Sequence, residues 1–237
     1  MEQAEAELRR RAQEIRERLG QAYGEPAGVR DLDPVSELVS TILSQNTNDA
    51  NRDVAFSRLR LRFPTWDDVL QADTEAVVDA IRPAGLANQK APWIQDALRA
   101  IIAERGELEL EFLRDRPVSE AKAWLSSLQG VGPKTAAIVL LFALGRPAFP
   151  VDTHVHRVSG RLGLIGPRVT REKAHDLLED LIPPEHYYSF HLNLIRHGRQ
   201  ICQARRPRCE ACFLTDLCDY YRQVVAPAQP AAVQDPE

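Results

Sequence analysis

The segment Leu128-Gln129-Gly130-Val131-Gly132-Pro133-Lys134-Thr135-Ala136 separates two apolar stripes that have helical spacing. The second stripe runs from Pro133 to Leu144, where Gly145 supplies a C-terminal stop. Glycines two positions apart permit a tight turn, and a proline suits the first position of the helix that follows. The segment therefore predicts two helices joined by a short glycine turn.

Helical periodicity extends over most of the rest of the chain. Asp33-Pro34 reads as an N-cap followed by proline at the first helical position, and no short stretch alternates as a strand would. The tail 224–237 is rich in Ala, Pro and Gln and is predicted to be disordered. We therefore predict an all-α protein of roughly ten helices, with apolar stripes at Leu8–Leu19, Val35–Leu43, Trp93–Ile102 and Ala121–Leu128 and further helices from about Thr153, Thr170 and Pro184.

Composition and charge exclude several classes of protein. The 237 residues are 44% apolar and 27% charged, which is typical of a globular protein. The longest apolar run, Ala136 to Leu144, is too short to span a membrane, and the N-terminus lacks the apolar stretch of a signal peptide. We therefore expect a cytoplasmic protein, associated with the nucleoid if the source is bacterial.

The charge is unevenly distributed along the chain. The net charge is -4, yet residues 133–209 carry twelve Lys or Arg against six Asp or Glu, and residues 186–209 contain no acid. Residues 67–79 carry five acids and no base. Such a division gives either an ordinary solvated surface or the positive face of a nucleic-acid binder.

The glycine segment is also a candidate site for chemistry. Helix-start amides after the turn form a seat for a phosphate, although a plain glycine turn explains the pattern as well. Lys134 lies in the first helical turn, where the helix dipole disfavours the ammonium and favours a nucleophilic amine. Eighteen residues later, Asp152 in Val151-Asp152-Thr153-His154 is placed either as a simple N-cap or as a carboxylate that deprotonates the amine.

The four cysteines are spaced as Cys202-x6-Cys209-x2-Cys212-x5-Cys218. In a reducing compartment such a cluster indicates metal ligands rather than disulfides. A single C-x2-C with unequal loops fits an iron–sulfur cluster at least as well as zinc. The first loop carries Arg205, Arg206 and Arg208, which a ligated loop would hold rigidly toward phosphates.

The glycine turn with its lysine, the V-D-T-H segment and the cysteine spacing together resemble the endonuclease III family of DNA glycosylases, within the helix-hairpin-helix superfamily. The resemblance runs from about Asp33 to Tyr220. It implies two helical lobes: residues 26–146, with six helices ending in the hairpin, and residues 1–25 with 147–223, which hold a [4Fe-4S] cluster. The partner it implies is double-stranded DNA with damaged bases or abasic sites, bound by a monomer.

Roles carried over from this resemblance fall on individual residues. It makes Lys134 the nucleophile, Asp152 the activating carboxylate, and Cys202, Cys209, Cys212 and Cys218 the cluster ligands. It also implies that Gln45 fills the hole left by an extruded nucleotide and that Leu86 wedges the opposite strand. Read without it, Gln45 is an exposed helix end and Leu86 a core residue beside a turn. The full set of expected DNA contacts is Gln45, Leu86, Gly130, Val131, Gly132, His154, Arg205, Arg206 and Arg208.

The activity expected from the resemblance is that of a bifunctional glycosylase and AP lyase for oxidised pyrimidines. Pro133 stands where many relatives carry a basic residue, which weakens phosphate contact there. Two alternatives stay open from the sequence. An adenine glycosylase would lack the lysine and carry a further C-terminal domain, and a non-catalytic DNA-binding or redox-sensing module would use the cluster alone. The preferred lesion and opposite base are not encoded in any of these motifs.

Overall fold

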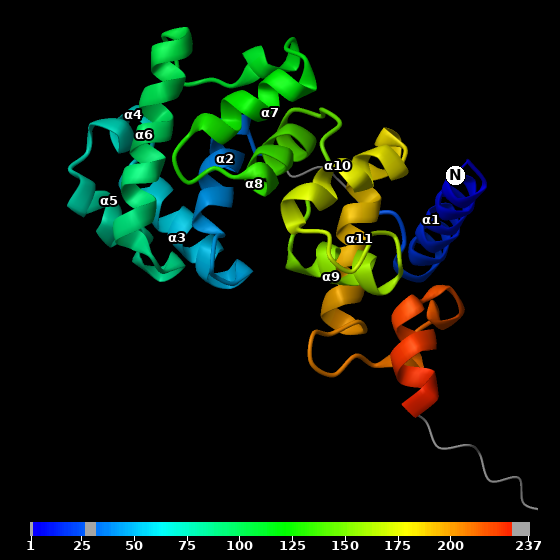
Figure 1. Ribbon diagram of the computed structural model, residues 1–237. Helices are drawn as coiled ribbons and strands as arrows, with labels where there is room; N and C mark the ends of the chain where they lie inside the picture. Colours follow the sequence, from blue (N-terminus) through cyan, green and yellow to red (C-terminus); the bar gives the residue numbers. More distant parts are fainter. Residues whose placement is uncertain (1, 27–31, 229–237) are drawn as a thin grey trace, which may run out of the picture. The chain divides into compact units, whose positions relative to one another are not determined.

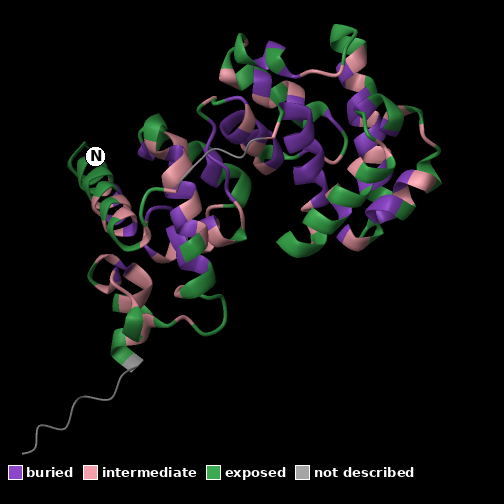
Figure 2. Ribbon diagram, turned by 180° about the vertical axis from the view of Figure 1, so that it is seen from behind, coloured by how far each residue is buried: buried purple, intermediate pink, exposed green. Residues whose placement is uncertain are grey.

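The computed structural model describes residues 2–26 and 32–228, and these residues form helices and connecting segments without a β-strand (Figure 1). The all-α prediction is confirmed. By their contacts the described residues divide into two compact units, one of residues 32–150 and one of residues 2–26 with 151–228. In both units the buried residues line the inner sides of the helices, as Figure 2 shows.

The 32–150 unit is built around α2 (Pro34–Leu43), whose ten residues are all buried. The sequence predicts one apolar face here, and the structure instead places the helix at the centre of the unit. Its polar residues are accommodated within the helix, because Thr41 Oγ1 donates to Glu37 Oε1 at 3.2 Å. The predicted N-cap is also present: Asp33 Oδ1 accepts from Ser36 N at 2.9 Å.

Six further helices of this unit surround α2. They are α3 (Asp49–Arg62), α4 (Trp66–Gln71), α5 (Thr74–Ile81), α6 (Ala87–Arg105), α7 (Val118–Ser127) and α8 (Pro133–Ile138), with 3-10 turns η1 (Arg82–Ala84) and η2 (Glu111–Arg114). α8 continues as a π-helical turn, η3 (Val139–Ala143), in which Leu144 N donates to Val139 O at 3.2 Å. The predicted stop at Gly145 is present, with φ of 63°.

The second unit combines both ends of the described chain. It contains α1 (Glu2–Tyr23), α9 (Thr153–Arg161), α10 (Arg171–Leu181) and α11 (Tyr187–Gln200), followed by short turns η4 (Pro184–His186), η5 (Cys209–Ala211), η6 (Thr215–Leu217), η7 (Tyr221–Val225) and η8 (Ala226–Ala228). α9 and α11 pack closely at Gly198, where a Cβ atom would lie 3.0 Å from His154 Cβ. α1 packs against α11 through a face that includes Ile15 and Leu19, both fully buried.

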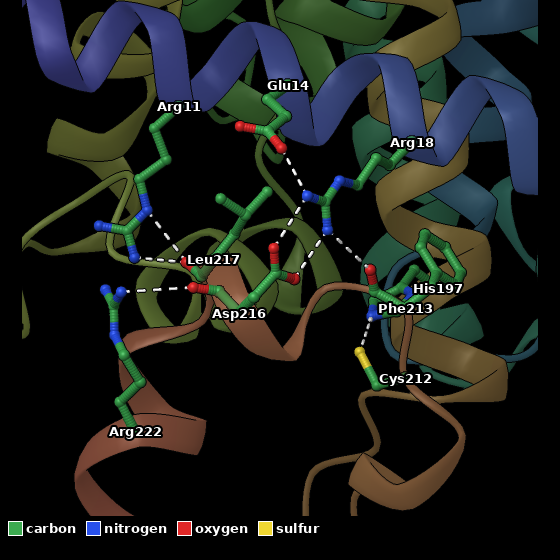
Figure 3. Close-up of polar contacts among 9 residues, drawn as sticks. All are labelled: Arg11, Glu14, Arg18, His197, Cys212, Phe213, Asp216, Leu217 and Arg222. Carbon is green, nitrogen blue, oxygen red and sulfur yellow. Dashed lines mark hydrogen bonds and ion pairs between the residues drawn. The ribbon is translucent and has the colours of Figure 1, made fainter.

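α1 is fastened to the cysteine segment by arginines (Figure 3). Arg18 forms two parallel bonds to Asp216, 2.7 Å from Nη1 to Oδ1 and 2.8 Å from Nη2 to Oδ2. Arg11 donates from Nε to Leu217 O at 3.0 Å and pairs with Asp219. A two-pronged Arg–carboxylate pair fixes orientation as well as distance, so these contacts set the position of η6 on α1.

Three predicted boundaries differ from the structure. By their contacts, residue 26 belongs with residues 151–228 and residues 147–150 belong with the 32–150 unit. The tail predicted to be disordered from residue 224 is helical up to Ala228, since the turn begun at Tyr221 continues through it, and residues 229–237 lie outside the described residues. Within the described ranges, no helix combines the length and apolarity needed to cross a membrane.

Candidate active site and cysteine centre

The glycine turn joins α7 to α8 and leans on a tryptophan of α6. Gly130 has a φ of +79°, and a Cβ atom there would lie 2.5 Å from Trp93 Cδ2, so both the backbone conformation and the close approach require glycine. Val131 is buried and its amide donates to Leu128 O at 3.0 Å. The contact with Trp93 and the Val131 hydrogen bond therefore hold the turn in one conformation.

Gly132 is the N-cap of α8 and has no side chain with which to cap it. The first-turn amides of a helix have no partner within the helix, so they can donate to an anion. Gly132 and Pro133 are exposed, and Lys134, the second residue of α8, is half-buried. The structure thus places the lysine beside an exposed, uncapped helix start, as the sequence predicts.

Two loops of the same unit carry the other predicted contacts. Gln45 is half-buried, and its Nε2 donates to Gly130 O at 2.7 Å, which ties the end of α2 to the glycine turn. Leu86 is 47% exposed, although leucine is usually buried, and it has a left-handed φ of 50° as the N-cap of α6. Asn46, which the sequence analysis did not select, is exposed with a φ of 53°. Adjacency to Gln45 in a turn of polar residues is the only sequence signal for it.

Asp152 lies in the second unit as the N-cap of α9, where its Oδ1 accepts from Val155 N at 2.7 Å. This cap leaves Oδ2 for another partner. His154 is half-buried, with Nδ1 3.1 Å from Arg157 Nη2. Lys134 and Asp152 belong to different units, and their joint action stays a prediction.

The four cysteines surround one space. Cys202, Cys209, Cys212 and Cys218 are free thiols, and all four line one pocket that is partly open to solvent. Cysteine thiolates are the ligands of iron–sulfur clusters and of many zinc sites. Four thiols around one pocket therefore form a candidate metal centre.

Side chains that the sequence analysis missed surround this cavity. Arg161 Nη1 donates to Cys202 Sγ at 3.3 Å, and its guanidinium lies 4.5 Å from the centroid of the Tyr220 ring. His197 is buried, with Nδ1 3.0 Å from Tyr23 Oη and Nε2 3.7 Å from Cys212 Sγ (Figure 3). Because the sequence spacing between these residues is irregular, only the fold reveals their neighbourhood.

The electrostatics of the pocket reflect its burial. Burial raises the pKa of the Cys212 thiol to about 11 and lowers the pKa of His197 to about 4. The imidazole of His197 is thus neutral at pH 7, and binding of a metal by the thiols would release their protons. Around the cavity, Arg161 supplies a positive charge next to the sulfurs.

Comparisons with known protein families match most of the chain. Residues 39–184 match the HhH-GPD superfamily of base excision DNA repair proteins. Residues 202–218, which begin and end at cysteines, match the iron–sulfur binding domain of endonuclease III. The protein therefore binds an iron–sulfur cluster, and the prediction of a [4Fe-4S] cofactor is confirmed.

Individual relatives agree with these matches. Endonuclease III of Thermotoga maritima is 35% identical over 84% of this chain and 88% of its own length. Endonuclease III of Escherichia coli strain K12 is 35% identical over 81% of this chain and 86% of its own length. An Arabidopsis thaliana relative is 44% identical over 70% of this chain, and the match spans little more than half, 56%, of that longer protein.

Solved structures extend the likeness to three dimensions. The structure titled a non-covalent endonuclease III–DNA complex superposes with a TM-score of 0.78 and 30% identity, over 90% of this chain and 96% of that chain. The structure of a trapped endonuclease III–DNA covalent intermediate gives the same TM-score and identity, over 90% and 97%. With the hairpin, the cysteine cavity and these matches in agreement, the chain belongs to the endonuclease III family of base excision DNA repair glycosylases.

Proposed function

We propose that this protein is a bifunctional DNA glycosylase and AP lyase that removes oxidised pyrimidines and then cuts the strand. The observation that carries the proposal is Lys134 in the exposed first turn of α8, directly after the glycine turn. Membership of the endonuclease III family supports it, as does the likeness to an endonuclease III trapped covalently on DNA. A glycosylase that activates water has no use for an amine at this position.

The chemistry assigned to the two candidate catalytic residues proceeds in balanced steps. The Lys134 amine attacks C1′ of the extruded nucleotide, the glycosidic bond breaks, and its electron pair leaves with the base. Asp152 accepts the proton that the lysine loses and stabilises the positive charge that develops on the sugar. The C1′–O4′ bond of the lysine adduct then breaks, and O4′ takes the proton held by Asp152, so that the sugar ring opens and an imine forms between Lys134 and C1′. The imine acidifies the C2′ proton, and removal of this proton expels the 3′ phosphate by β-elimination.

The remaining residues hold DNA and the cofactor. We assign Cys202, Cys209, Cys212 and Cys218 as ligands of the cluster, which supplies folding energy to the segment that carries the loop arginines. Arg205, Arg206 and Arg208 are exposed on that loop and suit phosphate contacts. Gln45, Leu86, Gly130, Val131, Gly132 and His154 complete the proposed DNA surface of a monomeric, cytoplasmic enzyme.

Borohydride trapping tests the central assignment, because it reduces an imine to a stable protein–DNA adduct. We expect wild-type protein to be trapped on a duplex containing thymine glycol. Lys134→Ala should abolish trapping and incision while retaining DNA binding, since the hairpin amides belong to the backbone. Asp152→Asn should slow base release and still cleave a preformed abasic site, where no base has to be expelled.

The small number of lysines makes the control simple. The chain has four, of which Lys90 is fully buried and Lys173 pairs with Asp176 at 3.2 Å on the exposed face of α10. Lys173→Ala should therefore be trapped like wild type. Undiminished trapping of Lys134→Ala would mean that another amine is the nucleophile, and release of base without any trapped adduct would indicate a monofunctional glycosylase.

A further inference from the structure

His197 is a buried imidazole, and each of its two ring nitrogens has a partner. It lies on α11 and is 1% exposed. Its Nδ1 is 3.0 Å from the hydroxyl oxygen of Tyr23, the last residue of α1. Its Nε2 is 3.7 Å from Cys212 Sγ, a contact drawn in Figure 3. The ring therefore bridges α1 to one of the four assigned cluster ligands, and neither step of the proposed reaction uses this bridge.

The side chain of Tyr23 is held in place from several sides. Its carbonyl accepts from Arg196 Nη1 at 3.0 Å, and the same guanidinium lies 4.9 Å from the centroid of the Tyr23 ring. The Phe213 ring packs edge-on against the rings of Tyr23 and His197, with centroid distances of 5.8 Å and 5.5 Å. Arg18, a second α1 residue, donates from Nη1 to Phe213 O at 3.2 Å. The hydroxyl thus meets Nδ1 in a fixed geometry.

The direction of the two hydrogen bonds follows from the chemistry of the sulfur. A cysteine that ligates a metal is a thiolate, which has no proton to donate. Nε2 must then carry the hydrogen and donate to Cys212 Sγ. A charged imidazolium would be costly at 1% exposure. In the neutral ring the other nitrogen is an acceptor, so Nδ1 of His197 accepts from the Tyr23 hydroxyl.

A hydrogen bond to a ligand sulfur changes how readily an iron–sulfur cluster gains an electron. The reduction potential of such clusters depends on hydrogen bonds to their sulfurs. The positive end of an N–H dipole stabilises the state with more electrons, so it raises the reduction potential. At Cys202 the side-chain donor is Arg161, which is always protonated and needs no outer partner. At Cys212 the donor is a neutral ring, which donates only in one tautomer.

We propose that Tyr23 and His197 form a hydrogen-bond chain that donates to Cys212 and thereby raises the reduction potential of the [4Fe-4S] cluster. His197 is the donor. Tyr23 is a positioning residue, because its hydroxyl holds the ring in the tautomer with hydrogen on Nε2. The proposal rests on Cys212 as a cluster ligand and is independent of the reaction assigned to Lys134.

Four variants separate the donor from its tautomer. Tyr23→Phe removes only the hydroxyl, and His197→Leu removes the donor. His197→Gln places an amide N–H where Nε2 stands, and an amide has no tautomer for the hydroxyl to select. The control is Tyr187→Phe. It removes the hydroxyl of another buried tyrosine in the same unit, one that donates to Glu179 O at 2.8 Å and does not line the cysteine pocket.

The experiment is a redox titration of each iron-loaded protein, followed by visible absorption and EPR. At a fixed applied potential, His197→Leu should lower the ratio of reduced to oxidised cluster about tenfold, which is about 59 mV for one electron. Tyr23→Phe should lower it about threefold, because the hydrogen bond is weakened rather than lost. His197→Gln and Tyr187→Phe should stay within about 1.5-fold of wild type. In the His197→Gln background, Tyr23→Phe should have no further effect, because the two positions are coupled.

A spectroscopic measurement identifies the donor directly. In the paramagnetic state of the cluster, pulsed EPR of wild-type protein with isotope-labelled histidine nitrogens should show one weakly coupled nitrogen. The same signal should be absent from His197→Gln, in which the donor is an unlabelled amide. If His197→Leu does not load iron, this signal and the titration of Tyr23→Phe decide the question.

Several results would overturn the proposal. They are an unchanged potential in His197→Leu, a shift in His197→Gln as large as that in His197→Leu, and equal shifts in Tyr23→Phe and Tyr187→Phe. A histidine signal that persists in His197→Gln would overturn it as well. So would wild-type protein that contains zinc and no cluster. Failure of the proposed function would look different, since the potentials would shift as expected while wild-type protein formed no borohydride adduct.

Discussion

Leu86 illustrates at the scale of one residue how stability and activity oppose each other. Its left-handed backbone is strained by about 1–2 kcal/mol, and 47% of its surface is exposed, so it contributes little to the core. We expect Leu86→Gly to leave the protein as stable as wild type or more stable by up to about 1 kcal/mol, because glycine accepts this φ. Thermal unfolding measures the stability, and excision from a stacked lesion should fall.

A control for this prediction is available in α3. Leu61 is 86% exposed in a regular helix, and Leu61→Gly should lower stability by up to about 1 kcal/mol through helix propensity alone. The same chemical change is thus expected to act in opposite directions at the two positions. A destabilised Leu86→Gly protein would contradict the strain argument.

Burial of Lys90 makes the free energy of unfolding depend on pH. Burial lowers its pKa to about 8 from the ordinary 10.5, so between these values the unfolded chain binds more protons at this residue than the folded chain. Stability contributed by this group must therefore rise as pH increases from about 8 to 10.5 and be constant below that window. The neutral amine still has two N–H groups for Leu43 O and Ala84 O, which accept from Nζ at 2.8 Å.

Urea unfolding of wild type and Lys90→Met at pH 7 and pH 10 isolates this contribution, since the other titrating groups are common to both proteins. The difference in unfolding free energy should move in favour of wild type at the higher pH. A difference that moves in favour of the methionine variant would show that the folded state holds the charged form more tightly than the unfolded chain does.

At the scale of elements, the glycine turn depends on α6 as much as on its own sequence. A Cβ atom on Gly130 would collide with Trp93 and would also require a left-handed alanine, whereas Gly132 has φ of -95° and open space around it. We expect Gly130→Ala to lower stability by about 1–3 kcal/mol. Gly132→Ala should lower it less, by about 0.5–1 kcal/mol, because alanine is a poorer N-cap than glycine. Thermal unfolding distinguishes the two.

Gly132→Ala is also the more direct test of the phosphate seat. Its methyl group would occupy open space at the start of α8 without disturbing the packing of the turn. Binding of an undamaged duplex should therefore weaken even though the variant folds normally. Unchanged DNA binding together with normal stability would place the phosphate elsewhere.

The features that the sequence alone predicts are those that depend on residues close together in the chain. The all-helical class and the glycine turn rest on periodicity and on such neighbouring residues. The cysteine spacing predicted metal ligands, and the resemblance to the family supplied the [4Fe-4S] cofactor. The burial of α2 on all sides, the left-handed φ of Asn46 and the bonds of Lys90 arise from contacts between distant segments. No pattern along the chain distinguishes Lys90 from a surface lysine, because its acceptors are backbone carbonyls that carry no side-chain signature.

At the scale of the whole molecule, the cysteine segment that holds the cofactor is joined to α1 by the bonds of Arg11 and Arg18. Anaerobically purified protein should be yellow-brown and contain about four iron atoms per chain. Cys212→Ser should lose the colour and destabilise the unit that contains α1, because metal ligation there is also folding energy. Iron analysis, visible absorption and limited proteolysis measure these effects. Stoichiometric zinc and a colourless wild type would refute the assignment.

The arginine contacts of α1 determine the order in which the two units can fold during synthesis. Arg11 and Leu217 are 206 positions apart, and Arg18 and Asp216 are 198 apart. During synthesis the ribosome must therefore release almost the whole described chain before α1 can contact these partners, whereas residues 32–150 form one compact unit from a continuous stretch of chain. Domains fold as units when their sequence emerges, and long-range contacts form late. The hairpin unit is thus expected to mature first, leaving α1 exposed to chaperones and proteases until the last cysteine emerges.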